Sequence, residues 1–177
     1  MLATGMALSG MAQMKDDNTV MVGGEAMYPK KDIVSNAVNS KDHTTLVAAV
    51  KAAGLVETLQ GTGPFTVFAP VNNAFEDLPA GTVENLLKPE NKGQLTTVLT
   101  YHVVAGKVDF ATLAAEIKRG KGEAMLTTVA GAKLKATMNG THNIVLTDAK
   151  GRRANISTYD VMQSNGVIHV IDAVLLP

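Results

Sequence analysis

Residues 154–177 read ANISTYDVMQSNGVIHVIDAVLLP, and this stretch decides the fold. Ala154 and Ile156 alternate with polar residues, which is the period of a strand with one solvated face. Ser164-Asn165-Gly166 has the composition of a tight turn. The chain from Val167 to Leu176 is then apolar on both faces, so we expect it to form a central strand.

The residues before this stretch predict more strands. Lys133, Lys135 and Thr137 alternate with apolar residues, which indicates a strand with one wet face. Asn139-Gly140 is the strongest short hairpin signal in the chain, and the run with Ile144 and Leu146 follows it. From Gly122 onward we therefore expect antiparallel strands.

Upstream of Gly122 the apolar period is 3.6 residues rather than 2. Apolar stripes predict helices over residues 42–54, 82–88, 94–102 and 109–120. Asp42 and Asp109 are suited to cap two of these helices, and Gly54 and Gly120 to follow their ends. One strand, Phe65–Ala69, interrupts this half. Helices followed by antiparallel strands favour the α+β class.

We expect one apolar core. The residues predicted to be buried together are Phe65, Val67, Phe68, Phe75, Leu99, Leu113, Val167, Ile168, Val170 and Ile171.

The N-terminal part does not fit the domain pattern. Residues 1–14, MLATGMALSGMAQM, carry no charge and are too short and too polar to span a bilayer. They are typical of a truncated signal peptide cleaved after Ala12, although an apolar tail has the same composition. Residues 15–31 are then expected to be an irregular lead-in, with residues 1–27 packing poorly and the folded domain occupying residues 32–177.

The composition excludes several classes of protein. Lys and Arg number 16, as do Asp and Glu, so the chain has no cationic surplus for nucleic acid. Cysteine is absent, which excludes disulfides, thiolate nucleophiles and cysteine-ligated zinc. Apolar residues are 46% of the chain, enough for a sizeable core.

Three ordered motifs resemble the fasciclin domain family, and in particular its small secreted bacterial single-domain members. They are GPFTVFAPVNNAFEDLP at residues 63–79, Tyr101-His102 followed by VVAGKV, and residues 154–177. The resemblance implies a wedge-shaped antiparallel β-sandwich with helices packed along one edge. It also implies an extracellular adhesion or matrix module without established catalytic activity. Val71 departs from the family, which usually has Thr there.

The resemblance also suggests partner-binding residues. In vertebrate fasciclin proteins an Asp-Ile pair and a Tyr-His segment are implicated in integrin recognition. The matching positions are Asp160-Val161 and Tyr101-His102. A scaffold role stays open, in which Val161 is a core residue and the Asp160 carboxylate accepts hydrogen bonds from the backbone.

Other polar residues favour structural roles. Asn72 and Asn73 stand where a strand ends and a helix begins, so we expect them to cap that helix. His169 lies on a strand face with Val167 and Ile171, which favours a buried imidazole. No pair among the four histidines has the spacing of a preformed metal site, and no hydrolase, kinase or dinucleotide motif is present. We therefore expect neither catalytic residues, metal nor cofactor.

The leading hypothesis is an extracytoplasmic, non-catalytic binding module that is secreted, periplasmic or at the cell surface. Its partner is expected to be a protein or polysaccharide of the surface or matrix, with no nucleic acid, no membrane span and a monomeric state. The alternative is a carrier or sensor with an apolar pocket of roughly several hundred Å³ between helices and sandwich. An unrecognised hydrolase is a third possibility, with His102 or His169 as its base.

Overall fold

The computed structural model describes residues 18–177. Its strands are β1 (Val20–Val22), β2 (Glu25–Met27), β3 (Phe65–Pro70), β4 (Val103–Ala105), β5 (Glu123–Thr127), β6 (Lys133–Asn139), β7 (Asn143–Thr147), β8 (Arg153–Gln163) and β9 (Gly166–Ile171). Its α-helices are α1 (Ile33–Ala37), α2 (Thr44–Ala53), α3 (Val56–Gln60), α4 (Asn72–Glu76), α5 (Thr82–Leu86), α6 (Lys92–Tyr101) and α7 (Phe110–Arg119). Two 3₁₀ helices, Lys41–His43 and Pro89–Asn91, precede α2 and α6.

Seven strands form one mixed sheet in the order β4-β3-β9-β8-β7-β6-β5. The prediction of the α+β class is confirmed, and β9 is central, between β3 and β8. The expectation of a purely antiparallel sheet is wrong, because β3 and β9 run parallel, with Phe68 opposite His169. A local pattern of residues shows that a segment forms a strand. It does not show whether that strand runs parallel or antiparallel to a strand that is distant in the sequence. Only the hairpin-linked neighbours are bound to be antiparallel.

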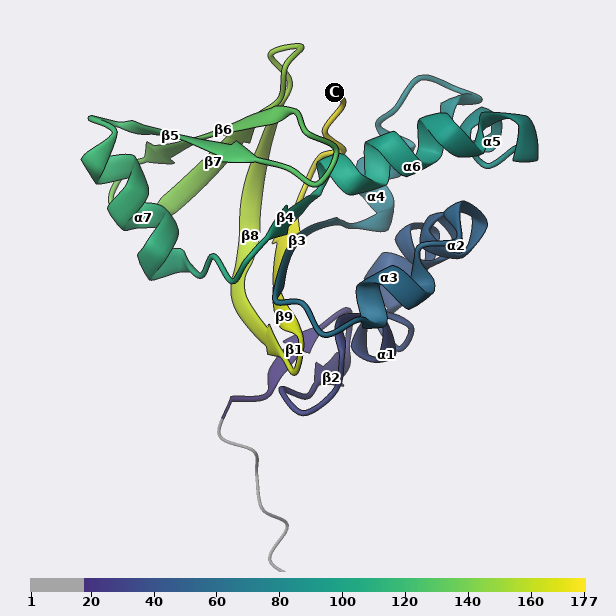
Figure 1. The fold of residues 1–177 in the computed structure, drawn as a ribbon, viewed down its shortest axis with the longest axis horizontal. Coiled ribbons are helices and arrows are strands. Elements are labelled where there is room, and N and C mark those ends of the chain that lie inside the picture. Colours follow the sequence, from purple (N-terminus) through teal and green to yellow (C-terminus); the bar gives the residue numbers. More distant parts are fainter. Residues whose placement is uncertain (1–17) are drawn as a thin grey trace, which may run out of the picture.

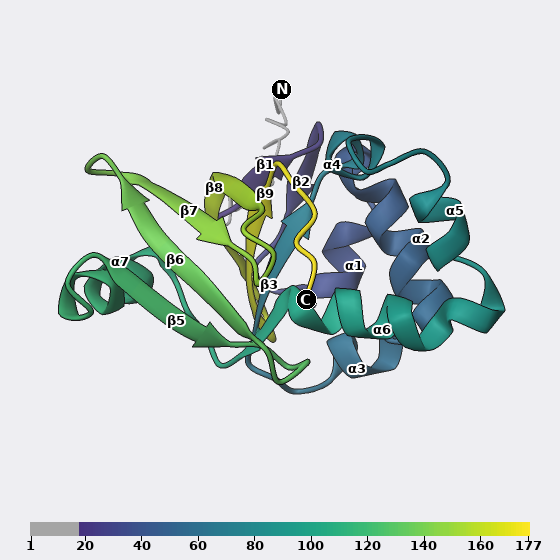
Figure 2. The same cartoon turned by 90° about the horizontal axis from the view of Figure 1, so that it is seen from above.

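The sheet curls, and its two ends approach each other. A single bridge joins Val104 of β4 to Thr128, just beyond β5. Helices α1 to α6 lie on one side of β3 and β9, whereas α7 lies against β5 and β6 at the other end (Figures 1 and 2). The helices expected along one edge are therefore present, except that α7 stands apart from them.

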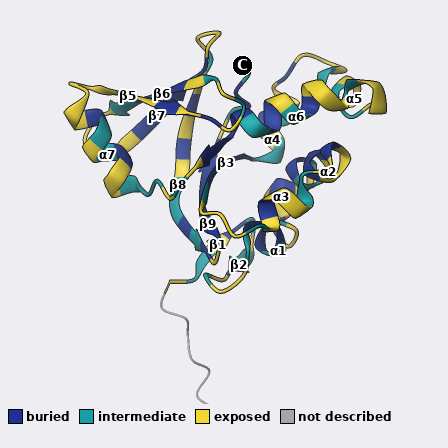
Figure 3. Cartoon of the chain, in the orientation of Figure 1, coloured by how far each residue is buried: buried dark blue, intermediate teal, exposed yellow. Residues whose placement is uncertain are grey.

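The curled sheet separates the apolar core into layers. Val67, Leu99 and Ile168 lie in the cluster between sheet and helices, whereas Phe68, Leu113 and Ile171 fill the inside of the curl. The expectation of a single core was wrong, because successive side chains of a strand point to opposite faces. Phe65 and Phe75 are only partly buried. Figure 3 shows the buried residues concentrated along β3 and β9.

The lead-in is more ordered than the sequence suggested. Strands β1 and β2 pair as an antiparallel hairpin, and Gly23 and Gly24 between them both have positive φ. Val22 and Met27 are buried in the cluster between sheet and helices. The expectation that residues through 27 pack poorly is therefore wrong for this hairpin, and folded structure precedes Asp32. The signal-like residues 1–14 lie outside the described residues.

Helix ends lie where the sequence predicted them when the capping residue is adjacent to the helix. The Asp109 carboxylate accepts a hydrogen bond from the Thr112 backbone at 2.8 Å and caps α7, as predicted. Gly54 ends α2 in the left-handed conformation that glycine adopts easily. Asp42 does not cap α2, because it lies in the 3₁₀ helix that precedes it.

The last strand is shorter than predicted. Strand β9 ends at Ile171, although Val174 and Leu175 are buried beyond it. The Leu175 backbone N–H donates to His102 Nε2 at 3.0 Å and that of Leu176 to the Asp148 carboxylate at 2.9 Å. The backbone of this C-terminal segment is thus held by hydrogen bonds to side chains rather than by pairing with a neighbouring strand. No helix within residues 18–177 has the length and apolarity to cross a membrane.

Candidate functional site

Tyr101 ends α6 and is fully buried inside the curl of the sheet. Its hydroxyl donates to the Lys133 carbonyl at 2.8 Å and accepts from the Ala149 backbone at 3.2 Å. Burial raises the pKa of this phenol. The side chain therefore holds β6 and the loop after β7 to the end of α6.

His102 follows Tyr101 and is buried as well. Because its Nε2 accepts from the Leu175 backbone, the ring proton lies on Nδ1, which donates to the Val98 carbonyl at 2.8 Å. Burial lowers the pKa of His102 to about 4, against the opposing effects of the Val98 carbonyl and the Asp148 carboxylate. The imidazole is thus neutral at pH 7 and ties the C-terminal segment to α6.

Asp160 lies in an irregular part of β8. The register of β8 against β9 shifts between Thr158 and Val161, and Asp160 there has a φ of 54°. This bulge aims the carboxylate at α7, where it accepts from the Phe110 backbone at 2.7 Å. Val161, the next residue, is fully buried among the helix-facing side chains.

His169 lies under this bulge on β9 and is fully buried. Its Nδ1 accepts from the Asp160 backbone at 3.3 Å, and its Nε2 donates to the Val108 carbonyl at 2.8 Å. The ring also stacks on Phe68 with centroids 5.7 Å apart. Burial lowers its pKa, although the Val108 carbonyl and the carboxylates of Asp160 and Asp109 oppose the shift. His169 thus joins β9, the bulge and the segment leading into α7.

The four residues predicted to bind a partner do not form one surface. Phe68 links His102 to Asp160, because its backbone donates to the His102 carbonyl at 2.9 Å and its ring stacks on His169, which accepts from the Asp160 backbone. Tyr101 and Val161 lie in different clusters. The side chains of Tyr101, His102 and Val161 are buried, so only the partly exposed Asp160 presents itself to solvent. Their partner-binding role stays a prediction.

Asp160→Ala is expected to reduce the free energy of unfolding by about 1–3 kcal/mol, because the Phe110 N–H loses its acceptor. Asp160→Asn keeps an oxygen and tolerates positive φ, so it should lose less. Urea titration of both variants beside an adhesion assay separates the two roles. Unchanged stability of the Ala variant with lost adhesion would contradict the scaffold role and identify a contact residue.

Asn72 reaches a different helix from the one predicted. Helix α4 has no side-chain cap, and Asn73 is exposed. Asn72 Oδ1 instead accepts from the Thr45 backbone at 3.1 Å, and its Nδ2 donates to the Lys41 carbonyl at 2.8 Å. The amide therefore caps α2 from across the fold, in place of Asp42.

Asn165 joins three segments, a role that the sequence did not reveal. Its Oδ1 accepts from the Ile33 backbone at 3.1 Å, and its Nδ2 donates to the Leu59 and Gly61 carbonyls. The turn between β8 and β9 is thus fastened to α1 and α3. The Ser-Asn-Gly composition predicted the turn, but nothing near it in the chain identified these distant partners.

A small apolar cavity lies between the helices and the sheet. Its volume is about 60 Å³, and its walls come from α1, α2, α3, α6 and β3, with Ile33, Leu46, Leu59, Val67 and Leu99 among them. In the part of the chain that the structure describes, no group of three His, Asp or Glu side chains could hold a metal.

Comparison with known proteins identifies the family. The model of the fasciclin domain matches residues 41–177. The chain is 45% identical to protein sll1483 of Synechocystis, over 99% of this chain and 90% of that protein. It is 31% identical to the cell surface glycolipoprotein MPB83 of Mycobacterium bovis, over 95% of this chain and 70% of that protein.

Among solved structures, the fold is similar to that of a FAS1 domain pair from the insect cell adhesion molecule Fasciclin I. The TM-score is 0.72 at 19% identity, and the match covers 83% of this chain and 51% of that one. The shared motifs, the family model and the 45% identical relative agree, and the chain belongs to the fasciclin domain family.

Proposed function

We propose that the chain is an extracytoplasmic, non-catalytic binding module that makes contacts at the cell envelope or in the surrounding matrix. Membership of the fasciclin family supports this function, as does the cell surface location in the name of its relative MPB83. The proposal places the protein outside the cytoplasm, secreted or at the cell surface, and as a monomer.

The observation that carries the non-catalytic role is the use of the two histidines. His102 and His169 were the sequence's candidates for a catalytic base, and each has both ring nitrogens hydrogen-bonded within the fold. Burial lowers the pKa of both imidazoles. A base must have a free nitrogen within reach of its substrate, so these rings support the scaffold rather than a hydrolytic reaction.

The cavity bears on the alternative function, a small-ligand carrier. It lies between helices and sheet, where that hypothesis needs a pocket, but its volume is about 60 Å³. Sites for drug-sized ligands measure roughly 300–1,000 Å³, and an apolar cavity known to bind benzene measures about 150 Å³. The volume therefore favours the surface-binding module over the carrier.

Adhesion to envelope material tests the proposed function. Fluorescent beads that carry the full chain are expected to be retained on envelope fragments of the source organism. Beads with heat-unfolded chain serve as the control for non-specific sticking. Equal retention of the two kinds of bead would reject the proposal.

A further inference from the structure

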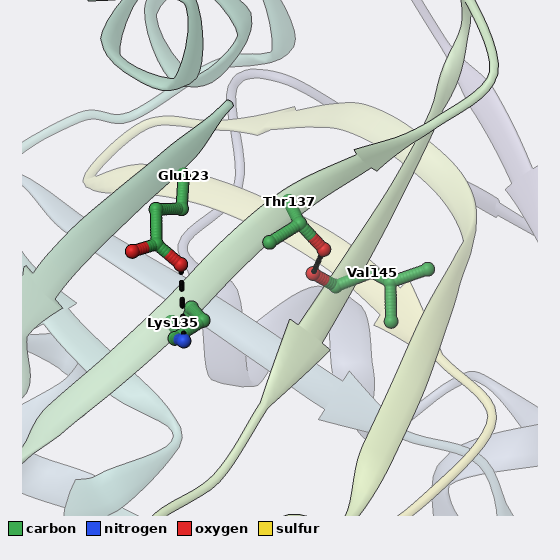
Figure 4. A network of polar contacts seen from close by, with 4 residues as sticks. All are labelled: Glu123, Lys135, Thr137 and Val145. Carbon is green, nitrogen blue, oxygen red and sulfur yellow. Dashed lines mark hydrogen bonds and ion pairs between the residues drawn. The ribbon is translucent and has the colours of Figure 1, made fainter. Parts of the chain in front are cut away.

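The outer face of strands β5 to β8 carries mostly polar side chains that are exposed or partly exposed, although Val145 on it is buried. The inner residues of these strands, such as Leu134 and Leu146, are buried in the curl. The residues between them face outward, because side chains alternate along a strand. Figure 4 shows part of this outer face, with Glu123 paired to Lys135 and Thr137 beside Val145.

The register aligns cations and hydroxyls across this face. Lys135 of β6 lies opposite Thr147 of β7, and Thr147 lies opposite Arg153 of β8. Neighbouring strands are about 4.8 Å apart, so the backbones of Lys135 and Arg153 are separated by about 10 Å. Lys133 points the same way, two residues from Lys135 along β6. We call Lys133, Lys135 and Arg153 the basic face.

Charge is segregated in this chain, although its net charge is zero. Residues 107–153 contain nine of the 16 Lys and Arg residues but only four of the 16 Asp and Glu residues. Two of these four carboxylates accept hydrogen bonds from backbone N–H groups: Asp109 caps α7, and Asp148 accepts from three N–H groups.

The other two carboxylates, Glu116 and Glu123, pair with Arg119 and Lys135. Among the described residues, no carboxylate pairs with Lys133 or Arg153; Lys133 instead donates to the Thr127 hydroxyl. The basic face thus has three cations against Glu123 and the nearby Asp172 carboxylate, which accepts from Asn155 beside Arg153. This leaves a small positive surplus that a polyanion would neutralise.

The side chains around these cations indicate the class of polyanion. No Phe, Tyr or Trp occurs between Phe110 and Tyr159, so the face has no platform for stacking nucleobases. Met125 is the exposed large apolar side chain of these strands. The aromatic anchors that dominate protein–protein interfaces are absent from the chain between Phe110 and Tyr159, so a protein partner is not favoured. The Thr147 hydroxyl lies between Lys135 and Arg153, and a hydroxyl there suits a hydroxyl-rich polymer.

We propose that the basic face binds an acidic polysaccharide in an extended form. This inference rests on the proposed binding function, and it names the partner and the surface. Cations attract the acidic groups while the Thr147 hydroxyl exchanges hydrogen bonds with the sugar. Glu123 competes with the polymer for Lys135 in the free protein. Its removal should therefore strengthen binding.

Dextran sulfate is the probe, with uncharged dextran as its matched polymer, and affinity is measured on the full chain at low salt. Lys133→Gln combined with Arg153→Gln is expected to weaken binding about tenfold, and to lessen its salt dependence, because fewer counterions are released. Glu123→Gln is expected to strengthen binding severalfold. The control is Lys88→Gln with Lys92→Gln, which removes two exposed cations from the helical side and should leave affinity unchanged.

Equal losses in the two double variants, or binding to plain dextran as tight as to dextran sulfate, would overturn the proposal. So would equally tight binding to duplex DNA or phosphatidylglycerol vesicles. The bead assay then separates the two proposals. A chain that is retained on envelope but ignores dextran sulfate refutes only the basic face. A chain that binds dextran sulfate through this face but not envelope refutes only the envelope function.

Discussion

Phe68→Ala is expected to reduce the free energy of unfolding by about 3–5 kcal/mol. The side chain is fully buried inside the curl and stacks on His169. Its removal leaves a cavity beside Tyr101 and Leu113, which belong to the same cluster. The neighbouring imidazole loses its stacking partner, and His169 holds both the bulge at Asp160 and the segment before α7. We therefore expect the loss to lie at the upper end of this range.

Denaturant titration of the full chain measures this effect. Met125→Ala is the matched control, because Met125 is 53% exposed on β5 and its truncation should change stability by less than about 0.5 kcal/mol. A loss below about 1 kcal/mol for Phe68→Ala would show that this ring is not a central element of the core.

Acidification from pH 6.5 to about 4 is expected to destabilise the fold strongly. Burial lowers the pKa of His102 from 6.5 to about 4, so the unfolded chain binds a proton in this range while the folded chain does not. Stability is then fully present above pH 6.5 and decreases as the pH falls toward 4. His102 alone accounts for about 3 kcal/mol, at 1.36 kcal/mol for each pH unit.

Two further imidazoles act in the same direction. Burial also lowers the pKa values of His43 and His169 in the folded state. As the pH falls, these two imidazoles are therefore protonated in the unfolded chain before they are protonated in the folded chain. Asp32 and Asp109 titrate in a lower range. Their folded pKa values lie below 3.8, and the stability that they contribute is lost only as the pH falls through those values. The loss above pH 4 therefore belongs to the histidines.

The test is the free energy of unfolding at several pH values between 7 and 4. His102→Gln should make the free energy of unfolding depend less steeply on pH, because one proton fewer is taken up on unfolding. This holds even if the variant is less stable at pH 7. Met125→Ala, the exposed control of the stability test, should keep the slope. A wild-type slope of zero, or an unchanged slope in His102→Gln, would contradict the buried neutral imidazole.

Features that depend on neighbouring residues were predictable from the sequence. Asp109 caps α7 and Gly54 ends α2, because each of these interactions spans only a few residues. The Asn139-Gly140 hairpin is present, and Gly140 has a φ of 77°, with a three-residue loop in place of a two-residue turn. The glycines of the β1–β2 hairpin carried the same kind of signal, but the strands beside them are too short to stand out.

The candidate site was only partly predictable. The motifs located Tyr101, His102, Asp160 and Val161, but burial of three of these side chains follows from what packs over them. Asp160 acts on α7 because a bulge in β8 turns its carboxylate toward Phe110, and no periodicity in the sequence contains that bulge. The basic face is another example, since Lys135 and Arg153 share a row only through their pairing with Thr147.

By itself, then, the sequence determined the α+β class, most long helices and strands, and the caps within them. Tertiary structure decided the parallel pairing of β3 with β9, the division of the core, and the partners of Asn72 and Asn165. The reason is the range of the interactions. Backbone periodicity and capping act over a few residues, whereas strand direction, burial and buried hydrogen bonds depend on segments that meet only when the whole chain has folded.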